Sequence, residues 1–186
     1  MTAEYDLLAL MADFFNTHDR RMRYEGDPGI EHWSEPRRLY EWLLRHQLIA
    51  PSDTVSEEDL QLARTLRDEL RRTIVNNNHY GPVQWDKLHE LMSLFPFRIV
   101  FEEQSAQLIP LQANGRKGLA NILAQMFDLR QANLWHRLRV CTAKDCQWVF
   151  VDRSRPGTGR WCSMKACGNR AKNKTFREKR KSEDGR

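Results

Sequence analysis

All four cysteines of this sequence lie close together near its C-terminal end. They form two pairs of the same kind, Cys141-x4-Cys146 and Cys162-x4-Cys167, and fifteen residues separate the pairs. Two short pairs joined by a hairpin-sized spacer can supply four thiolates to one tetrahedral Zn²⁺. Disulfides, an iron–sulfur cluster and unliganded thiols are the alternatives, and a reducing compartment disfavours disulfides. We therefore expect one structural zinc ion per chain, bound by these four cysteines.

The residues between and after the cysteines predict a hairpin followed by a helix. Residues 147–151 have the composition of a strand, and residues 152–159 contain proline and glycine and predict a turn. Residues 160–161 would begin the second strand of the hairpin. Ser163 can cap a helix that runs towards Arg180. A segment this short folds poorly alone, so we expect metal binding to supply folding free energy. The aromatic residues expected to form its small core are Trp148, Phe150 and Trp161.

The net charge of +5 conceals a strong asymmetry. Residues 1–136 hold 15 Lys and Arg against 20 Asp and Glu, or −5, whereas residues 137–186 hold 15 against 5, or +10. A positive field on one short segment is typical of a polyanion binder, with a solvated, disordered tail as the alternative. A metal-bound scaffold would hold the charges in register with phosphates, which favours nucleic-acid binding. The expected contacts are Arg153, Arg155, Arg160, Arg170, Lys172, Lys174, Arg177, Lys179 and Arg180.

The first 136 residues predict a mostly helical domain with one β-hairpin, which makes the whole chain α+β. Apolar residues at three- and four-residue steps indicate the helices, and Ser56 begins a capping box. No Gly, Pro or Ser occurs between Gly118 and Cys141, which predicts one long helix that couples the domain rigidly to the cysteines. The expected helices are 5–15, 36–49, 57–74, 85–92 and 116–137, with a break at 76–82 and a hairpin of 97–101 with 106–111.

The sequence lacks the patterns of an enzyme or a membrane protein. Its histidines form no HExxH motif, and Gly115–Gly118 lacks the spacing of a phosphate-binding loop. No apolar run approaches the roughly 20 residues that span a bilayer. The N-terminus has no basic segment ahead of its short apolar stretch, unlike a secretory signal. We therefore expect a non-enzymatic protein of the cytoplasm with no membrane partner.

The cysteine region resembles the CGNR zinc finger of bacterial proteins, and the preceding region is similar to the ABATE domain that accompanies this finger. The finger carries Cys141-x4-Cys146-x3-Phe150-x-Asp152-x-Ser154-Arg155, and then Arg160-Trp161-Cys162-Ser163-Met164-x2-Cys167-Gly168-Asn169-Arg170-x-Lys172. The upstream similarity lies in Asp13-Phe14-Phe15-Asn16-Thr17, Trp42-Leu43-Leu44, the 97–111 hairpin and Leu138-x-Val140-Cys141.

This resemblance implies a stress-induced transcription regulator of the bacterial cytoplasm, associated with the nucleoid. Residues 137–181 would bind DNA, residues 1–136 would be a sensor and residues 182–186 a disordered tail. An RNA-binding or ribosome-associated zinc protein is the alternative.

The resemblance also assigns residues to the start of the DNA-reading helix. Gly168 would permit a close backbone approach or an unusual dihedral angle. Asn169 would face an adenine edge and Arg170 a guanine edge, or these residues would have structural roles within the cysteine turn. One finger covers few base pairs, so selective binding in a genome suggests a homodimer or a partner protein. A small-molecule effector could occupy a pocket lined by aromatic residues of the N-terminal half, namely Phe14, Phe15, Trp33, Trp42, Trp85 and Phe127.

Overall fold

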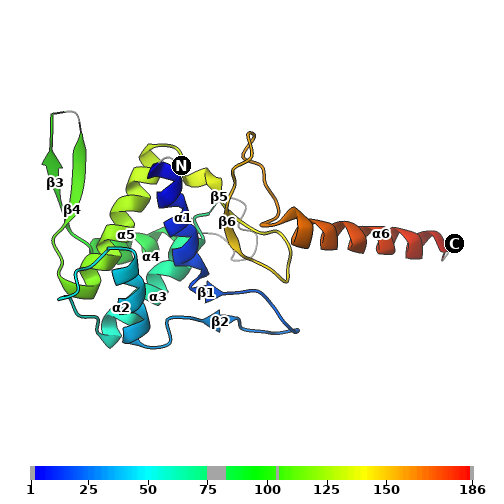
Figure 1. Ribbon diagram of the computed structural model, residues 1–186, viewed down its shortest axis with the longest axis horizontal. Coiled ribbons are helices and arrows are strands. Elements are labelled where there is room, and N and C mark those ends of the chain that lie inside the picture. Colours follow the sequence, from blue (N-terminus) through cyan, green and yellow to red (C-terminus); the bar gives the residue numbers. More distant parts are fainter. Residues whose placement is uncertain (1–2, 75–82, 104, 185–186) are drawn as a thin grey trace.

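The computed structural model describes residues 3–74, 83–103 and 105–184, which form a mostly helical N-terminal part and a cysteine-containing hairpin plus helix (Figure 1). The predicted break at 76–82, with His79, lies outside the described residues. The helices are α1 Ala3–Asn16, α2 Pro36–Arg45, α3 Glu57–Arg71, α4 Trp85–Ser93, α5 Asn114–Gln131 and α6 Asn169–Asp184, with short helical turns η1 Trp135–Arg137 and η2 Met164–Gly168. The strands are β1 His18–Asp19, β2 Ile30–Glu31, β3 Phe97–Phe101, β4 Ala106–Pro110, β5 Leu138–Val140 and β6 Val149–Val151.

Helix α1 lies at the centre of the fold, where it contacts α3, α5 and β6 (Figure 1). Its residues Leu8, Phe14 and Phe15 are fully buried, as expected for the apolar stripe of an amphipathic helix. Helix α3 starts at the predicted capping box. The Ser56 hydroxyl accepts a hydrogen bond from the Asp59 N–H at 3.1 Å, and the Asp59 carboxylate accepts one from the Ser56 N–H at 2.9 Å. This cap fixes the start of α3 beside the core.

Within the described residues, three two-stranded antiparallel sheets accompany the helices. The predicted hairpin of residues 97–111 is confirmed, and β3 pairs with β4 from Phe97 opposite Pro110 to Phe101 opposite Ala106. It projects away from the helices (Figure 1). A second pair, β1 with β2, joins the two ends of the segment of residues 20–29. The third pair, β5 with β6, leads into the cysteines.

The predicted long helix over residues 116–137 is wrong, because α5 ends at Gln131. Asn133 has a φ of 55°, which lies in the left-handed region. The Leu134 N–H donates to the Leu129 carbonyl at 2.8 Å and the Asn133 N–H to the Arg130 carbonyl at 3.0 Å, which is the hydrogen-bond pattern of a Schellman motif. Asparagine tolerates the left-handed conformation and can end a helix without glycine. The chain therefore turns before the cysteines, and no continuous helix couples the two parts.

The hairpin of the cysteine region also differs from the expected one. Strand β6 pairs with β5, with Leu138 opposite Val151 and Val140 opposite Val149. Residues 160–161 form no strand, and the Arg160 carbonyl accepts a hydrogen bond from the Thr142 N–H at 2.9 Å. Leu138, Val140 and Val149 are at most 1% exposed and belong to the same core as the helices. The hairpin is thus built onto the N-terminal helices, and the expected boundary after residue 136 falls within η1, directly before β5.

Helix α6 extends away from the rest of the molecule (Figure 1). It continues through residues 182–184, which the sequence analysis assigned to a disordered tail. No glycine or proline interrupts the sequence between Asn169 and Gly185, so nothing in it stops the helix earlier. Within the described ranges, no helix is long and apolar enough to cross a membrane.

Candidate metal centre

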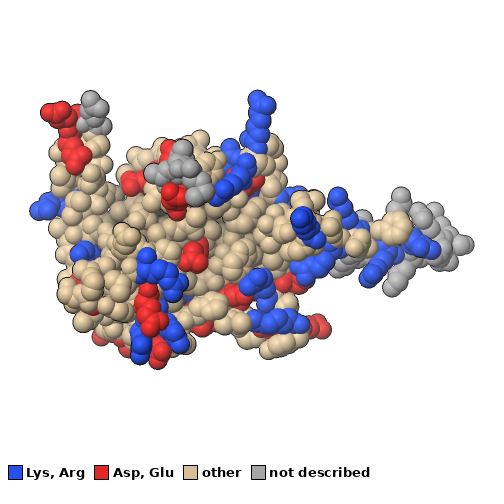
Figure 2. Space-filling view, viewed as in Figure 1, with Lys and Arg blue, Asp and Glu red and all other residues tan. Residues whose placement is uncertain are grey.

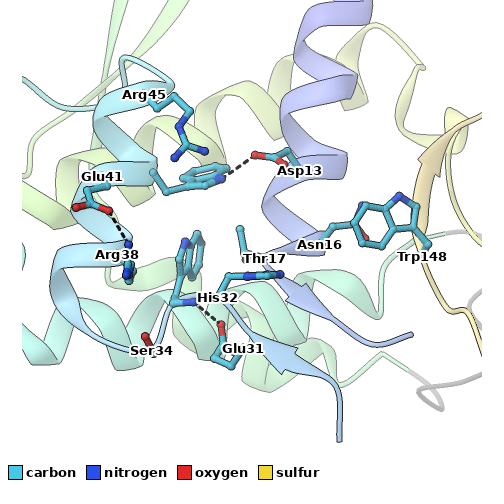
Figure 3. A pocket seen from close by; sticks show the side chains of 12 residues that line it. Asp13, Asn16, Thr17, Glu31, His32, Ser34, Arg38, Glu41, Arg45 and Trp148 are labelled. Atoms are coloured by element: carbon cyan, nitrogen blue, oxygen red, sulfur yellow. Dashed lines mark hydrogen bonds and ion pairs between the residues drawn. The ribbon is translucent and has the colours of Figure 1, made fainter. Parts of the chain in front are cut away.

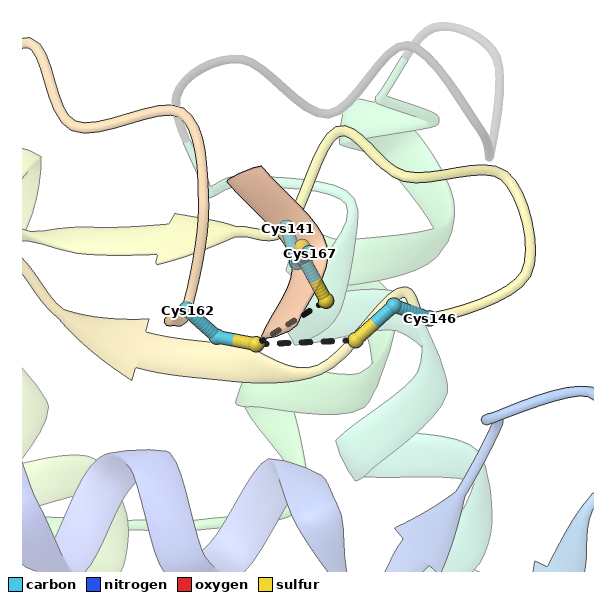
Figure 4. Close-up of side chains that lie close together, drawn as sticks. All are labelled: Cys141, Cys146, Cys162 and Cys167. Atoms are coloured by element: carbon cyan, nitrogen blue, oxygen red, sulfur yellow. Dashed lines mark hydrogen bonds between the residues drawn. The ribbon is translucent and has the colours of Figure 1, made fainter. Parts of the chain in front are cut away.

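The four cysteine side chains converge on one point between β5–β6 and η2 (Figure 4). Their Sγ atoms all lie within 4.8 Å of one another, and the cysteines form no disulfide. The Cys146 and Cys162 Sγ atoms are 3.6 Å apart, and those of Cys162 and Cys167 are 3.7 Å apart. Four thiolates at about 2.3 Å from a tetrahedral Zn²⁺ would be separated by about 3.8 Å. The cluster therefore suits one Zn²⁺, as the sequence predicts.

The first pair of ligands is held by a turn over residues 141–147, here called the first knuckle. The Cys141 N–H donates to the Trp148 carbonyl at 2.9 Å, directly after the β5–β6 ladder. The Cys146 N–H donates to the Ala143 carbonyl at 2.9 Å, and Gln147 follows with a φ of 52°. This left-handed residue turns the chain from the second ligand into β6. The ladder and the tight turn together set the position of both thiols.

The second pair of ligands is held by residues 162–168, the second knuckle. The Ser163 hydroxyl accepts a hydrogen bond from the Ala166 N–H, so the predicted cap is confirmed. Gly168 is buried and its φ is not positive. A Cβ atom at Gly168 would lie 2.9 Å from the Met164 Sδ atom, at the flexible end of an exposed side chain. Its role is thus close packing, with no unusual dihedral angle.

The electrostatics of the metal-free cluster favour one thiolate and oppose four. Hydrogen bonding by Cys146 lowers the pKa of the Cys141 thiol to about 5. Burial raises the pKa of the Cys162 thiol to about 12, and the pKa of Cys146 is also raised, chiefly by its hydrogen bond to Cys141 and by burial. Four neighbouring thiolates therefore need a cation among them. A Zn²⁺ ion supplies that charge and displaces the thiol protons when it binds.

Arg170 adds a positive charge beside the cluster. Its Nη2 atom donates to the Cys167 Sγ atom at 3.2 Å, and its Nη1 atom pairs with the Asp145 carboxylate at 2.8 Å. The hydrogen bond to Cys167 raises the pKa of Arg170, so the guanidinium stays charged. These contacts tie the start of α6 to both knuckles. Asn169 is exposed, and its amide donates to the Lys165 carbonyl at 3.3 Å.

The three aromatic residues of the region pack against the cysteines, as the sequence predicts. Trp148, Phe150 and Trp161 are partly buried and surround the cluster of Cys141, Cys146 and Cys167. Apolar rings around a metal site exclude water and lower the local dielectric constant, which strengthens the metal–thiolate interaction.

A loop over residues 152–159, here called the basic loop, is held by contacts that sequence analysis missed. Asp152 is 4% exposed, and its carboxylate accepts hydrogen bonds from the Ser154 N–H at 2.9 Å and the Gly159 N–H at 2.5 Å. Arg139 donates to the Gly159 carbonyl at 2.7 Å, and Arg137 to the Ser154 carbonyl at 2.5 Å. Arg137 of η1 and Arg139 of β5 thus have a structural role. The only sequence signal was Asp152 within the finger motif.

The predicted nucleic-acid contacts are spread over the basic loop and α6. Lys and Arg side chains line the described part of α6, whereas acidic side chains mark the distant tip of β3–β4 (Figure 2). Arg160 stacks over Trp161 at 5.2 Å, and Arg153 over Tyr5 at 5.4 Å. The side chains of Lys174 and Lys179 lie outside the described residues. The exposed members of the set are Arg153, Arg155, Arg160, Asn169, Arg170, Lys172, Arg177 and Arg180.

The metal centre is joined to the N-terminal helices by two polar side chains that the sequence analysis did not single out. The Asn16 amide donates to the Val149 carbonyl at 2.8 Å and accepts from the Val149 N–H at 2.9 Å. Arg71, only 1% exposed, donates to the carbonyls of Phe15 and Gln147. Asn16 therefore occupies the free edge of β6 as a neighbouring strand would. The only hint was its place in the Asp13–Thr17 motif.

Comparisons with known protein families agree with these two parts. A family described as a putative stress-induced transcription regulator, ABATE, matches residues 8–129. The CGNR zinc finger family matches residues 137–180. No curated protein matches the chain. The resemblance that the sequence motifs indicate is thus confirmed for both parts.

Proposed function

The chain belongs to the ABATE family of putative stress-induced transcription regulators and carries a CGNR zinc finger, and on this premise we propose that it regulates transcription by binding DNA. The family description points to a regulator and away from an enzyme. In this proposal residues 137–181 bind the nucleic acid, residues 1–136 regulate that binding, and the protein associates with the nucleoid.

The observation that carries the proposal is the exposure of cations on a scaffold fixed by the metal. Arg155 lies on the basic loop, which Asp152 holds, and Lys172 lies on α6 directly after the second knuckle. Cations on such a fixed surface can meet successive phosphates at a low entropic cost. Arg170 has a further role, because its guanidinium already contacts Cys167 and Asp145. We propose that it supports the metal site and extends towards DNA with its remaining donors.

Fluorescence anisotropy with the zinc-loaded full chain tests this function. Affinity for duplex DNA should fall by about a thousandfold between low and moderate salt if six or more phosphates are neutralised. Arg155→Ala and Lys172→Ala should each weaken binding to all sequences and reduce the salt slope by about one. Arg98→Ala is the matched control, because Arg98 is equally exposed but lies on β3.

Competition between duplex DNA and structured RNA distinguishes the two nucleic-acid partners. Preference for the RNA would favour an RNA-binding or ribosome-associated protein. Failure of the zinc-loaded chain to bind either polyanion would refute the proposal.

We further propose that two copies of the chain bind one operator. A single short finger contacts few base pairs, and selectivity in a genome requires a longer site. Sedimentation of the complex with a selected duplex should give two chains per DNA molecule. A selective, nanomolar complex with one chain would contradict this stoichiometry.

A further inference from the structure

A cavity of about 510 Å³ lies where the N-terminal helices meet the β5–β6 hairpin of residues 138–151, here called the zinc hairpin (Figure 3). Its wall consists of the C-terminal end of α1, the segment from β2 into α2, one face of α2, and Trp148 next to β6. Cavities of this size commonly hold small molecules. No cysteine of the metal centre lines it, so the cavity is a separate site.

Three indole rings form the aromatic part of the wall. Trp33 and Trp42 are at most 6% exposed and pack edge to face, with ring centroids 5.4 Å apart. Trp148 is partly buried and projects from the β6 side (Figure 3), with the Arg21 guanidinium 4.2 Å from its ring centroid. Because aromatic faces attract flat unsaturated rings, these walls favour a planar ligand.

The carboxylates of the wall already have partners. Because each is engaged by N–H groups or cations of the protein, none of them is left to neutralise a cationic ligand. The pairs are Asp13 with Trp42 at 2.8 Å and His46 at 2.9 Å, Glu31 with Arg67 at 2.9 Å, and Glu41 with Arg37 at 3.0 Å and Arg38 at 3.3 Å.

Among the donors of the wall that have no protein partner within the described residues, one is buried and one is an exposed cation. The Trp33 Nε1 atom is buried and has no partner within the described residues, and buried N–H groups without a partner are uncommon in folded proteins. Arg45 extends from α2 over the cavity (Figure 3), and its guanidinium forms no hydrogen bond or ion pair in the part of the chain that the structure describes. Unused donors beside paired carboxylates favour a ligand that is rich in acceptors.

We propose that this cavity binds a planar aromatic carboxylate. The ring lies against Trp42 and Trp148, and the carboxylate accepts hydrogen bonds from Arg45. Charge-assisted hydrogen bonds between a guanidinium and a carboxylate are among the stronger polar contacts in proteins. Binding at this site does not depend on the proposed function, although its effect on DNA does.

A ligand in the cavity acts on the zinc hairpin through two residues of the cavity wall, because one lies in the hairpin and the other is hydrogen-bonded to it. Trp148 lines the cavity and packs against the cysteine cluster. Asn16 also lines the cavity and holds both polar backbone groups of Val149. A ligand that contacts these side chains stabilises one position of the hairpin relative to others, and such a difference between states is what couples two sites.

Calorimetry with the zinc-loaded full chain and 2-naphthoate tests the site. The neutral amide of 2-naphthoate lacks the charge, and cyclohexanecarboxylate lacks the flat ring. We expect 2-naphthoate to bind at least about tenfold more tightly than either, and Arg45→Ala to weaken it by about tenfold or more. Arg45→Lys should recover part of the affinity, and Arg98→Ala should leave it unchanged. Equal binding of the amide, unchanged binding by Arg45→Ala, or no binding of 2-naphthoate at millimolar concentration would overturn the proposal.

Hydrogen exchange at the Val149 amide tests the coupling without DNA. Saturating 2-naphthoate should slow this exchange in the natural protein, and the same concentration should have little effect in Arg45→Ala, which binds the ligand weakly. An exchange rate at Val149 that does not change when the ligand is bound would refute the coupling. If the ligand binds and slows exchange but the protein binds no DNA, the proposed function fails and the site stands.

Discussion

Replacing Asn16 by alanine should uncouple the zinc hairpin from the N-terminal helices. The side chain makes two hydrogen bonds to the backbone of Val149, a residue that is 1% exposed. Without them, a buried N–H and a buried carbonyl lose their partners at about 1–3 kcal/mol each. The variant should therefore lose about 2–6 kcal/mol of stability. For a chain of this length, that corresponds to a melting temperature lower by roughly 4–24 °C.

Circular dichroism of the zinc-loaded proteins measures the melting temperature, and a chromogenic chelator measures how fast zinc is released. Asn121→Ala is the matched control, because Asn121 makes one hydrogen bond, to the Leu48 carbonyl at 2.8 Å, away from the metal. We expect Asn16→Ala to melt lower and release zinc faster, and Asn121→Ala to show a smaller melting shift and no change in release. If Asn16→Ala melts within about 2 °C of the natural protein and releases zinc at the same rate, Asn16 does not hold the hairpin.

Three further substitutions probe the metal centre and the basic loop. Cys162→Ser should reduce the zinc content from one ion per chain to nearly none, because a structural site needs all four thiolates; full occupancy by metal analysis would contradict the ligand set. Arg170→Ala should weaken zinc binding in chelator competition, since it removes the hydrogen bond to Cys167, whereas Lys172→Ala should not; equal zinc affinities would exclude this role. Burial by itself raises the pKa of Asp152, but hydrogen bonds from the loop outweigh it and hold the pKa below its ordinary value. The natural protein should therefore exceed Asp152→Asn in unfolding free energy near pH 6, and this advantage should disappear as the pH falls below about 4; a difference independent of pH would contradict it.

Features that arise from neighbouring residues could be predicted from the sequence. The spacing of the cysteines indicated both knuckles, because each pair of ligands comes from one short turn. Ser56 and Ser163 indicated helix starts, because a cap needs only the next three residues. The β-rich composition and the short turn indicated the hairpin of residues 97–110. Charge asymmetry located the exposed cations at the C-terminal end.

Contacts between distant segments could not be predicted, because they depend on how the whole chain packs. Asn16 and Val149 are 133 residues apart, so no local pattern could pair them. Strand β6 pairs with β5 because Leu138 and Val140 are buried in the helical core, which the spacer sequence alone does not reveal. Asn133 ends α5 in a left-handed conformation that asparagine is able, but not obliged, to adopt. The cavity likewise exists only because α1, α2 and Trp148 surround the same space. Local preferences selected the turns and helices, and burial of apolar surface selected how they meet.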